Sequence, residues 1–450
     1  MRPDLIARYA DQRLPRYTSY PTAPHFNPGV GPDVYAGWLA ATPDGTPASL
    51  YVHVPYCRRM CWYCGCNTSV TLRDEPVAEY GEMLKAEIGR VRDHLGKRLP
   101  VIHLHFGGGT PTIMAPKLFR DLMAQLRETF DFRPEAELAI EIDPRTLTRE
   151  MVEVLAAGGI NRASLGVQSL DPVVQKAINR VQTYEQTADA VTWLRAAGIT
   201  GINLDLIYGL PHQSVASSVE TVTECLALAP DRVAVFGYAH VPGFKKHQRR
   251  IDAATLPGGA ERNAEAEAIA ATLANAGYRQ IGIDHFAHPD DSLAVAQAEG
   301  RLHRNFQGYT TDPAQLLIAF GASAIGRLAQ GYVQNDPVVR GYSQAIAAGR
   351  FATIKGYALT DDDRLRADLI ERLMCDFRVD LDAICRRHGC RPDALGDALA
   401  RIDEMAADGI VRRRDGVIEI APDAQALARA VAATFDAYLP NSTRTHSPAL

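Results

Sequence analysis

Three closely spaced cysteines are the residues of this sequence with the clearest capacity for chemistry. They are Cys57, Cys61 and Cys64, and their spacing is C-x3-C-x2-C. Cysteine thiolates are the usual ligands of iron–sulfur clusters, which are normally fixed by four of them. Three thiolates hold three irons of a four-iron cluster, which leaves the fourth iron open to a ligand from outside the protein. The spacing therefore predicts a 4Fe-4S cluster with one open position.

Other uses of these thiols are less consistent with the sequence. Cys66 could be a fourth ligand, but the short Cys64-Gly-Cys66 spacing brings its thiol too close to Cys64 for both to reach separate irons, so we interpret it as a nonligand. A structural zinc site usually pairs two short ligand clusters across a longer loop, and no second cysteine pair has comparable spacing. A disulfide is not expected either, because residues 1–8 lack the apolar region of a secretory signal, and cytosolic thiols stay reduced.

The composition is that of an ordinary globular protein. The chain has 450 residues, of which 46% are hydrophobic and 22% are charged, and this length is enough for two or three domains. The net charge of −5 argues against a general affinity for nucleic acid. No apolar run is long enough to span a bilayer. We therefore expect a cytoplasmic protein that binds neither nucleic acid nor membrane.

Short β-branched segments alternate with helical segments through the first two-thirds of the chain. The expected strands are Leu50–Val54, Val101–His105, Leu138–Ile142, Arg162–Val167, Ile202–Leu206 and Val233–Tyr238. The expected helices between them include Val77–His94, Pro116–Phe130, Met151–Ala157 and Ser217–Leu228. Alternation at this interval predicts βα units and a parallel sheet, so the fold class is α/β.

Residues with chemical potential follow the expected strands, and in parallel α/β folds the chemistry lies at the carboxyl ends of the strands. The cysteines follow the first strand, Gly107–Thr110 the second and Gln168 the fourth, while Glu141 and Asp205 lie near the ends of the third and fifth. Glycines let backbone approach a ligand closely, and a carboxylate such as Glu141 accepts hydrogen bonds from two hydroxyl groups.

The cysteine triplet and the glycine run resemble the radical S-adenosylmethionine (SAM) superfamily. That resemblance implies a partial (β/α)6 barrel with SAM on the open iron, and an N-terminal extension and a mostly helical C-terminal domain flank it here. The ordered motifs narrow the resemblance to the oxygen-independent coproporphyrinogen III dehydrogenase family. They are Arg16–Ala23, Cys64–Asn67, His105–Thr112, Glu141–Pro144, Gly166–Ser169, Asp205–Pro211, Tyr238–His240 and Asn305–Thr311.

The family resemblance implies a reaction and its cofactors. The reaction is the oxidative decarboxylation of two propionates of coproporphyrinogen III to vinyl groups, started by a 5′-deoxyadenosyl radical. Two SAM molecules are implied, and Tyr51, Glu141 and Cys66 are implied in catalysis. The first SAM would be held by Tyr51, Gly108 and Glu141. The second would be held by Tyr63, Gly109, Thr110, Gln168, Arg180, Asp205, Ala239 and Ile325.

The resemblance also implies a monomer that receives electrons from a reduced flavodoxin- or ferredoxin-type donor. The substrate carries four carboxylates, and the basic stretch Lys245–Arg250 could bind them, because arginine binds carboxylates with two hydrogen bonds. Two alternatives remain. One is a haem-binding or haem-transfer protein on the same scaffold, and the other is an anaerobic haem-degrading enzyme. Cys66 and the Arg16–Ala23 motif argue against the haem-binding relatives, which generally lack both features.

Four segments follow from these patterns. Residues 1–45 form an N-terminal segment that we expect to cover the active site, and residues 46–285 form the barrel with the cluster and SAM sites. Residues 286–360 extend the barrel and connect it to residues 361–450, whose amphipathic helices and hairpin are typical of a winged-helix-like domain. The mixed charge of Asp403–Asp415 argues against DNA binding by that domain.

Overall fold

The computed structural model describes residues 8–9 and 12–439, which divide into two compact units. The barrel unit comprises Asn27–Tyr278 and Ala314–Ala358. The terminal unit comprises the described residues of Met1–Phe26, Arg279–Pro313 and Leu359–Leu450. The four-segment division of the chain stays a prediction.

The barrel unit is built on a parallel sheet that contains all six expected strands. They are β1 (Ala48–Val54), β4 (Pro100–Gly108), β5 (Asp131–Ile142), β6 (Arg162–Gln168), β7 (Gly201–Tyr208) and β8 (Arg232–Gly237). Each pairs in parallel with the next, in the order β1-β4-β5-β6-β7-β8. The carboxyl ends of the six strands therefore lie along one edge. The predicted α/β fold with a partial barrel is confirmed.

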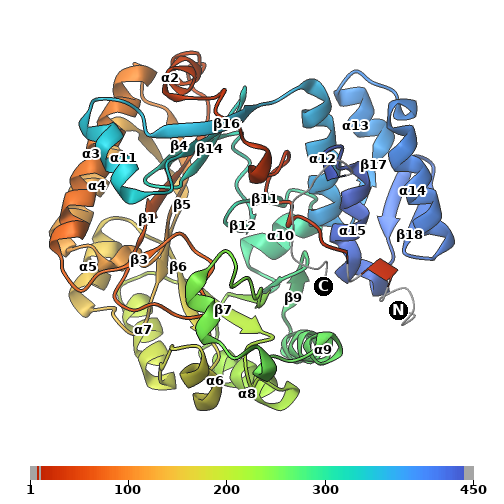
Figure 1. Cartoon of the computed structure of the whole chain (residues 1–450), viewed down its shortest axis with the longest axis horizontal. Coiled ribbons are helices and arrows are strands. Elements are labelled where there is room, and N and C mark those ends of the chain that lie inside the picture. Colours follow the sequence, from red (N-terminus) through yellow and green to blue (C-terminus); the bar gives the residue numbers. More distant parts are fainter. Residues whose placement is uncertain (1–7, 10–11, 440–450) are drawn as a thin grey trace. The chain divides into compact units, whose positions relative to one another are not determined.

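Helices that precede, connect or follow these strands pack around the outside of the sheet (Figure 1). They are α2 (Pro32–Ala40), α3 (Glu75–Leu95), α4 (Pro116–Thr129), α5 (Arg149–Ala157), α6 (Pro172–Ala177), α7 (Tyr184–Ala196), α8 (Val215–Leu226) and α9 (Gly259–Asn275). In α4, a proline opens the first turn and Leu118, Leu122 and Leu126 are buried along one face. This spacing of three to four residues is what an amphipathic helix needs to cover a sheet. Strand β1, with almost every residue buried, has the composition of a parallel strand covered on both faces.

A further parallel strand, which the sequence alternation did not predict, lies on the other side of β1. It is β13 (Leu316–Phe320), paired in register from Ala48 with Leu316 to Val52 with Phe320. Strands β14 (Ile325–Leu328), β15 (Gly331–Asn335) and β16 (Thr353–Ala358) continue the sheet with antiparallel pairing, and α11 (Val339–Ala347) joins β15 to β16. The first half of the chain and residues 314–358 therefore form one sheet.

A buried carboxylate ties this returning segment to the first helix of the barrel. Glu87 in α3, 1% exposed, accepts hydrogen bonds from Gly321 N (2.8 Å), Tyr342 Oη (2.8 Å) and Asn335 Nδ2 (2.7 Å). Burial raises the pKa of Glu87 to about 7, and the three hydrogen bonds only partly offset this effect. Three elements distant in sequence thus meet at one ionisable group.

The terminal unit contains the helices expected near the carboxyl end and a small antiparallel sheet. Its elements are β9 (Arg279–Ile281), β10 (His285–Ala287), α10 (Ser292–Ala298), β11 (His303–Asn305), β12 (Gly308–Thr310), α12 (Asp361–Asp376), β17 (Arg378–Asp380), α13 (Leu381–Arg387), α14 (Gly396–Ala407), β18 (Val411–Arg414), β19 (Val417–Ile420) and α15 (Ala428–Ala432). Strands β17, β19 and β18 pair in that order. The helices and hairpin predicted for residues 361–450 are therefore present within the described residues.

The Arg16–Ala23 motif packs into the core of the terminal unit. Tyr17 and Tyr20 are 4% and 3% exposed. Tyr17 Oη donates a hydrogen bond to Asp436 Oδ2 (3.0 Å), and Tyr20 Oη accepts one from Ala437 N (2.9 Å). The aromatic residues of this motif are therefore held by the carboxyl-terminal part of the same unit, and the motif's predicted role as a cover of the active site stays a prediction.

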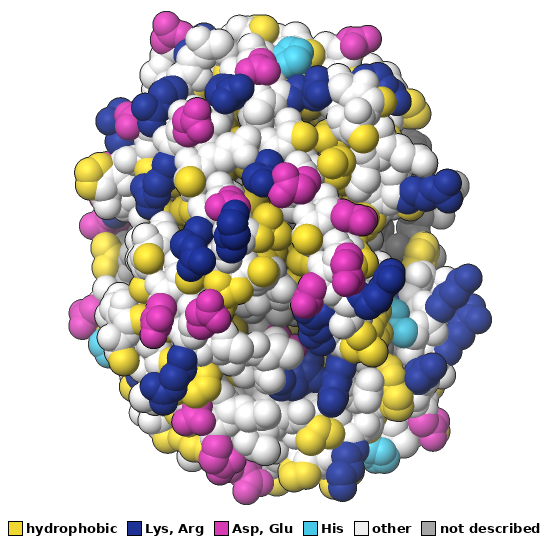
Figure 2. Space-filling model, turned by 90° about the vertical axis from the view of Figure 1, so that its left-hand side faces the viewer, with side chains coloured by type: hydrophobic (Ala, Val, Ile, Leu, Met, Phe, Trp, Pro, Cys, Tyr) yellow, Lys and Arg dark blue, Asp and Glu magenta, His cyan; other side chains and the backbone are white. Residues whose placement is uncertain are grey.

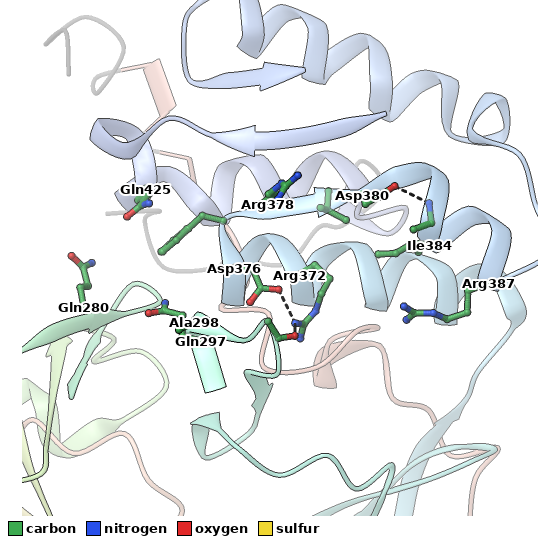
Figure 3. A pocket seen from close by; sticks show the side chains of 14 residues that line it. Gln280, Gln297, Ala298, Arg372, Asp376, Arg378, Asp380, Ile384, Arg387 and Gln425 are labelled. Carbon is green, nitrogen blue, oxygen red and sulfur yellow. Dashed lines mark hydrogen bonds and ion pairs between the residues drawn. The ribbon is translucent and has the colours of Figure 1, made fainter. Parts of the chain in front are cut away.

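A cavity of about 670 Å³ also lies within the terminal unit, lined by residues of α12 and α13, by residues 377–380 between them and by residues 297–300 (Figure 3). Two of its basic side chains have acidic partners. Arg372 Nη1 lies 2.7 Å from Asp376 Oδ2, and Arg387 Nη1 lies 3.2 Å from Asp368 Oδ2. None of the residues predicted to do chemistry lines this cavity.

The charged surface agrees with the weak net charge. On the face shown in Figure 2, Lys and Arg side chains are interspersed with Asp and Glu. That face carries no basic stripe of the kind that follows a nucleic-acid backbone. Within the described residues, no helix is both long enough and apolar enough to cross a membrane.

Candidate active site

The predicted cluster ligands lie in the loop that follows β1, where each sulfur has a hydrogen-bond partner. This loop, residues 57–67, begins at β2 (Tyr56–Cys57) and ends before β3 (Ser69–Val70). Thr110 Oγ1 donates to Cys57 Sγ (3.4 Å), and the hydroxyl of Thr68 lies 3.3 Å from the same sulfur. Cys64 Sγ accepts from the backbone N–H of Cys66 (3.4 Å). We call this segment the cysteine loop.

The donors around these sulfurs fit a thiolate cluster. Hydrogen bonds from the side chain and backbone of Cys66 lower the pKa of the Cys64 thiol to about 7. The same contact raises the pKa of Cys66, because its thiol is the donor. Within the described part of the chain, no three His, Cys, Asp or Glu side chains converge closely enough to hold a single metal ion.

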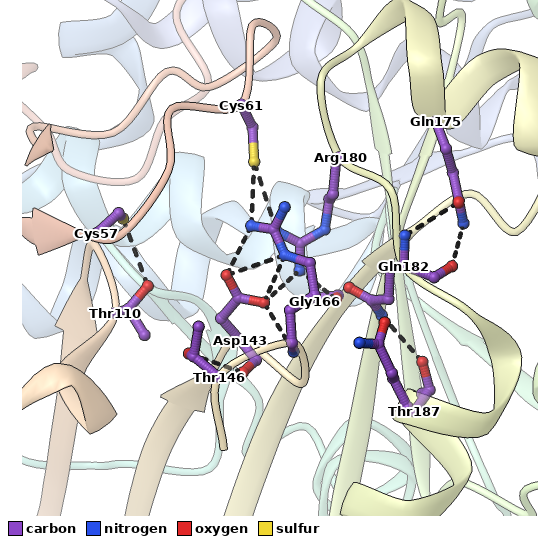
Figure 4. A network of polar contacts seen from close by, with 12 residues as sticks. Cys57, Cys61, Thr110, Asp143, Thr146, Gly166, Gln175, Arg180, Gln182 and Thr187 are labelled. Atoms are coloured by element: carbon purple, nitrogen blue, oxygen red, sulfur yellow. Dashed lines mark hydrogen bonds and ion pairs between the residues drawn. The ribbon is translucent and has the colours of Figure 1, made fainter. Parts of the chain in front are cut away.

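The third sulfur, Cys61 Sγ, is contacted by two arginines. Arg145 Nη2 and Arg180 Nη1 each lie 3.5 Å from it. Both arginines also bind the carboxylate of Asp143, Arg145 with two nitrogens at 2.7–2.9 Å and Arg180 at 3.4 Å. Figure 4 shows Cys61, Asp143 and Arg180 facing one another. Although burial opposes it, the arginine pairing lowers the pKa of Asp143 below its usual value.

Backbone carbonyls of the cysteine loop are bound by side chains that follow β8. Gln248 Nε2 donates to Tyr63 O (2.9 Å), His247 Nε2 lies 2.7 Å from Cys64 O, and Lys245 Nζ donates to Cys66 O (2.9 Å). Gln248 is 1% exposed. The basic stretch that we expected to meet substrate carboxylates thus supports the cysteine loop through Lys245 and His247. We call Lys245, His247 and Gln248 the carbonyl clasp.

Tyr51 in β1 and Glu141 in β5, predicted to hold the first SAM, both contact His105 of β4, Tyr51 by ring stacking and Glu141 through its carboxylate. Tyr51 Oη bonds His53 Nδ1 (2.9 Å), and His53 Nε2 bonds Asn67 O (2.9 Å). Nε2 must donate to the carbonyl, so in a neutral imidazole Nδ1 accepts from the tyrosine hydroxyl. Burial lowers the pKa of His53, in keeping with that form. Tyr51 and His53, two positions apart on β1, therefore share one face of the strand.

Glu141 is held from two sides. Its carboxylate accepts from Gly108 N (3.1 Å) and lies 3.2 Å from His105 Nε2. Desolvation alone would raise the pKa of Glu141, but the contacts with His105 and Gly108 lower it below its ordinary value. The side chain keeps 39% of its surface exposed. Glu141 is thus a fixed, ionised carboxylate with surface left for a ligand.

The glycine run is required by the protein's own side chains. A Cβ at Gly107 would lie 2.8 Å from Glu141 Oε1, and one at Gly108, whose φ is +113°, would lie 2.6 Å from His53 Cε1. A Cβ at Gly109 would lie 2.6 Å from Tyr56 O. Their Cβ positions face Glu141, His53 and the start of the cysteine loop. The predicted close approach of this backbone to a ligand stays a prediction.

The remaining predicted residues lie farther along the same strand edge. Gln168 ends β6 in a left-handed conformation (φ 72°). Asp205 in β7 receives hydrogen bonds from Ser164 Oγ (2.9 Å) and Asn203 Nδ2 (2.8 Å). Ala239 follows β8, and its carbonyl accepts from Gln248. Ile325 opens β14 and pairs with Gln334 of β15.

Arg145 is the site residue that sequence reasoning missed. It lies two positions beyond Asp143, at the start of the segment that follows β5. The signal was present in the order Glu141-Ile-Asp143-Pro-Arg145, where an acid and a base two residues apart can pair. Nothing local, however, shows that the pair faces a cysteine 84 positions earlier.

Comparison with known proteins agrees with this geometry. Residues 51–225 match the Radical SAM superfamily. The chain is 58% identical over 450 residues, covering all of both proteins, to "Oxygen-independent coproporphyrinogen III oxidase" of Bradyrhizobium diazoefficiens. It is 44% identical over 95% of both chains to the protein of the same name from Paracoccus denitrificans.

A solved structure is also similar over nearly the whole length. It is coproporphyrinogen III oxidase (HemN) from Escherichia coli, described as a radical SAM enzyme, with a TM-score of 0.91 and 38% identity. The match covers 95% of this chain and 100% of that one. Whole-length identity of this order goes well beyond a shared barrel. The chain therefore belongs to the oxygen-independent coproporphyrinogen III oxidases, a family of radical SAM enzymes.

Proposed function

We propose that this protein converts coproporphyrinogen III to protoporphyrinogen IX without oxygen, by oxidative decarboxylation of two propionates to vinyl groups in haem biosynthesis. The observation that carries the proposal is the set of hydroxyl, guanidinium and amide donors on the sulfurs of Cys57, Cys61 and Cys64. The whole-length identity to relatives of that name supports the substrate.

Cys57, Cys61 and Cys64 are assigned as the ligands of a 4Fe-4S cluster. When bound, the reduced cluster and SAM supply a 5′-deoxyadenosyl radical that removes a hydrogen atom from the substrate propionate. The donors around the three sulfurs hold the thiols ready for deprotonation, and the carbonyl clasp keeps the cysteine loop in place. Cys66, whose thiol is a donor to Cys64, is assigned to catalysis and not to the cluster.

Two SAM sites are assigned along the strand edge. Tyr51, Gly108 and Glu141 are assigned to the first, where the ionised Glu141 accepts hydrogen bonds from hydroxyl groups. The second is assigned to Tyr63, Gly109, Thr110, Gln168, Arg180, Asp205, Ala239 and Ile325. Support comes from Arg180 Nε, a buried donor without a hydrogen-bond partner. An N–H that is buried and unpaired costs free energy unless a ligand satisfies it.

We assign a flavodoxin- or ferredoxin-type protein as the electron donor, because the cluster must receive single electrons. The protein acts as a monomer in the cytoplasm. Support for the location comes from the reduced state that the three thiols require.

The first test is anaerobic turnover by cluster-loaded protein. SAM, a strong reductant and coproporphyrinogen III are added, and the porphyrins are separated by chromatography after oxidation. We expect tricarboxylate and dicarboxylate products together with 5′-deoxyadenosine. Cys61→Ser should lose both the cluster absorbance and turnover, because a hydroxyl is a poor iron ligand.

Two further serine variants separate the roles of the cysteines. Cys66→Ser should keep the iron and sulfide content of the parent and lose turnover, whereas Cys390→Ser should keep both. Deoxyadenosine without any change in the porphyrin would reject this substrate. Tight haem binding without turnover would instead indicate a haem-transfer protein.

A further inference from the structure

Arg145 is held in place more firmly than a surface arginine. It makes two hydrogen bonds to Asp143, Nε to Oδ1 (2.9 Å) and Nη2 to Oδ2 (2.7 Å), and its side chain is 10% exposed. The same Nη2 also lies 3.5 Å from Cys61 Sγ. A two-point arginine–carboxylate pair fixes the plane of the guanidinium. The guanidinium of Arg145 therefore lies beside Cys61 in a fixed orientation.

The charges around Cys61 do not cancel. Asp143 is shared by Arg145 and by Arg180, whose side chain is 6% exposed. Two guanidinium groups and one carboxylate leave one net positive charge beside the sulfur. Cys61 is itself 7% exposed, so water screens this charge weakly.

The three sulfurs therefore have different surroundings. Hydroxyl groups of Thr68 and Thr110 lie beside Cys57, and a backbone N–H meets Cys64. Guanidinium groups contact Cys61. Hydrogen bonds and net charge near the sulfurs are among the factors that set the reduction potential of an iron–sulfur cluster.

We propose that Arg145, oriented by Asp143, is a positioning residue that raises the reduction potential of the cluster through Cys61. One-electron reduction makes the cluster more negative, and a neighbouring positive charge stabilises that state. The inference rests on the cluster part of the proposed function and does not depend on the porphyrinogen substrate. Arg180 shares the contact with Cys61, but it is already assigned to SAM, so Arg145 is the cleaner residue to test.

The test is a redox titration of the reconstituted full-length protein, with the reduced cluster followed by electron paramagnetic resonance. Arg145→Met keeps the length of the side chain and removes its charge and donors. At the midpoint potential of the parent, we expect the reduced-to-oxidised ratio of this variant to fall about tenfold, which is about 59 mV for one electron. Arg145→Lys keeps the charge, so its reduced-to-oxidised ratio at that potential should fall less.

Arg149→Met is the matched control. Arg149 lies four positions later and stacks on Trp193, with its guanidinium carbon 4.9 Å from the ring centroid. Its midpoint should equal that of the parent. Iron and sulfide are measured in every variant, because a general loss of structure lowers cluster content without setting a new midpoint.

Each outcome bears on one assignment. An Arg145→Met midpoint equal to that of the parent overturns the inference and leaves the proposed function standing. If Arg145→Met loads no cluster, the neutral variant Arg145→Gln takes its place, and a midpoint equal to that of Arg149→Met overturns the inference. A parent protein that loads no cluster rejects the cluster assignment itself.

Discussion

Gly108 combines two separate demands on a single residue. Its φ of +113° is costly for any residue with a Cβ, and that Cβ would lie 2.6 Å from the imidazole of His53. Its N–H also donates to Glu141. A substitution here should therefore disturb the Tyr51–His53 pair and the Glu141 carboxylate together.

Replacing Gly108 by alanine should cost more stability than backbone strain alone. Gly96 provides the comparison, because it has a φ of +62° with nothing within 4 Å of its Cβ position. Gly96→Ala should lower the free energy of unfolding by about 1–2 kcal/mol, because alanine is strained in a left-handed backbone. Gly108→Ala should lower it by about 1–3 kcal/mol more, because the new methyl group would overlap the His53 ring. Urea unfolding of both variants, followed by circular dichroism, measures the difference. Equal losses would mean that His53 moves aside without penalty.

Residue types and short spacings predicted the cysteine ligands, but not what supports them. The C-x3-C-x2-C run is local, so its meaning is visible in the sequence. Four residues that contact its sulfurs and carbonyls lie 53 to 185 positions away, namely Thr110, Arg145, Arg180 and Gln248. Such contacts depend on which strand edges the fold brings together. For this reason the sequence does not predict that Lys245 and His247 support the cysteine loop, or that Arg145 contacts Cys61.

At the scale of elements, the site depends on connections between strands as much as on the strands. The six parallel strands were predictable because βα alternation repeats along the chain. Strand β13 was not predictable in that way. Its partner β1 lies more than 260 positions earlier. The segment between β8 and β13 breaks the alternation of strand and helix. The segment after β8 had no regular period either, yet it supplies the carbonyl clasp.

Removing Gln248 should loosen the cysteine loop without changing its ligands. In the parent, its amide donates to Tyr63 O and accepts from Val241 N (2.6 Å). Gln248→Ala leaves both backbone groups unpaired, at a cost of about 1–3 kcal/mol for each group that stays buried. We expect faster loss of iron to a chelator from the loaded protein. Gln186→Ala removes an exposed helix-capping amide and should release iron at the parental rate, and equal rates for both variants would show that the clasp does not hold the loop.

At the scale of the whole molecule, Glu87 makes the stability of the barrel unit depend on pH. Folding raises the pKa of Glu87 from 4.5 to about 7. Between these values the folded chain binds more protons than the unfolded chain, so stability falls as pH rises through this window. Below about 4.5 the contribution of Glu87 is fully present, and above about 7 the loss is complete.

A glutamine at position 87 should remove this dependence. Glu87→Gln cannot titrate, so its unfolding free energy should vary less between pH 4.5 and 7 than that of the parent, by on the order of 3 kcal/mol. It should also be less stable at low pH, because an amide cannot accept all three hydrogen bonds. Glu82→Gln, on the same helix with a side chain 61% exposed, should keep the parental pH profile. Denaturant unfolding at a series of pH values gives the comparison, and parallel profiles for the parent and Glu87→Gln would contradict the assignment.

The carbonyl clasp has a consequence for the protein during its synthesis. Its contacts join residues 183 and 185 positions apart, and Asn67 at the end of the cysteine loop binds Pro337 O, 270 positions later. A ribosome adds about 5–20 residues per second, so the three cysteines leave the exit tunnel roughly 10–40 s before the clasp residues do. During that interval the carbonyls of the cysteine loop have no clasp partner. The loop therefore gains these contacts only after residues 245–248 have emerged.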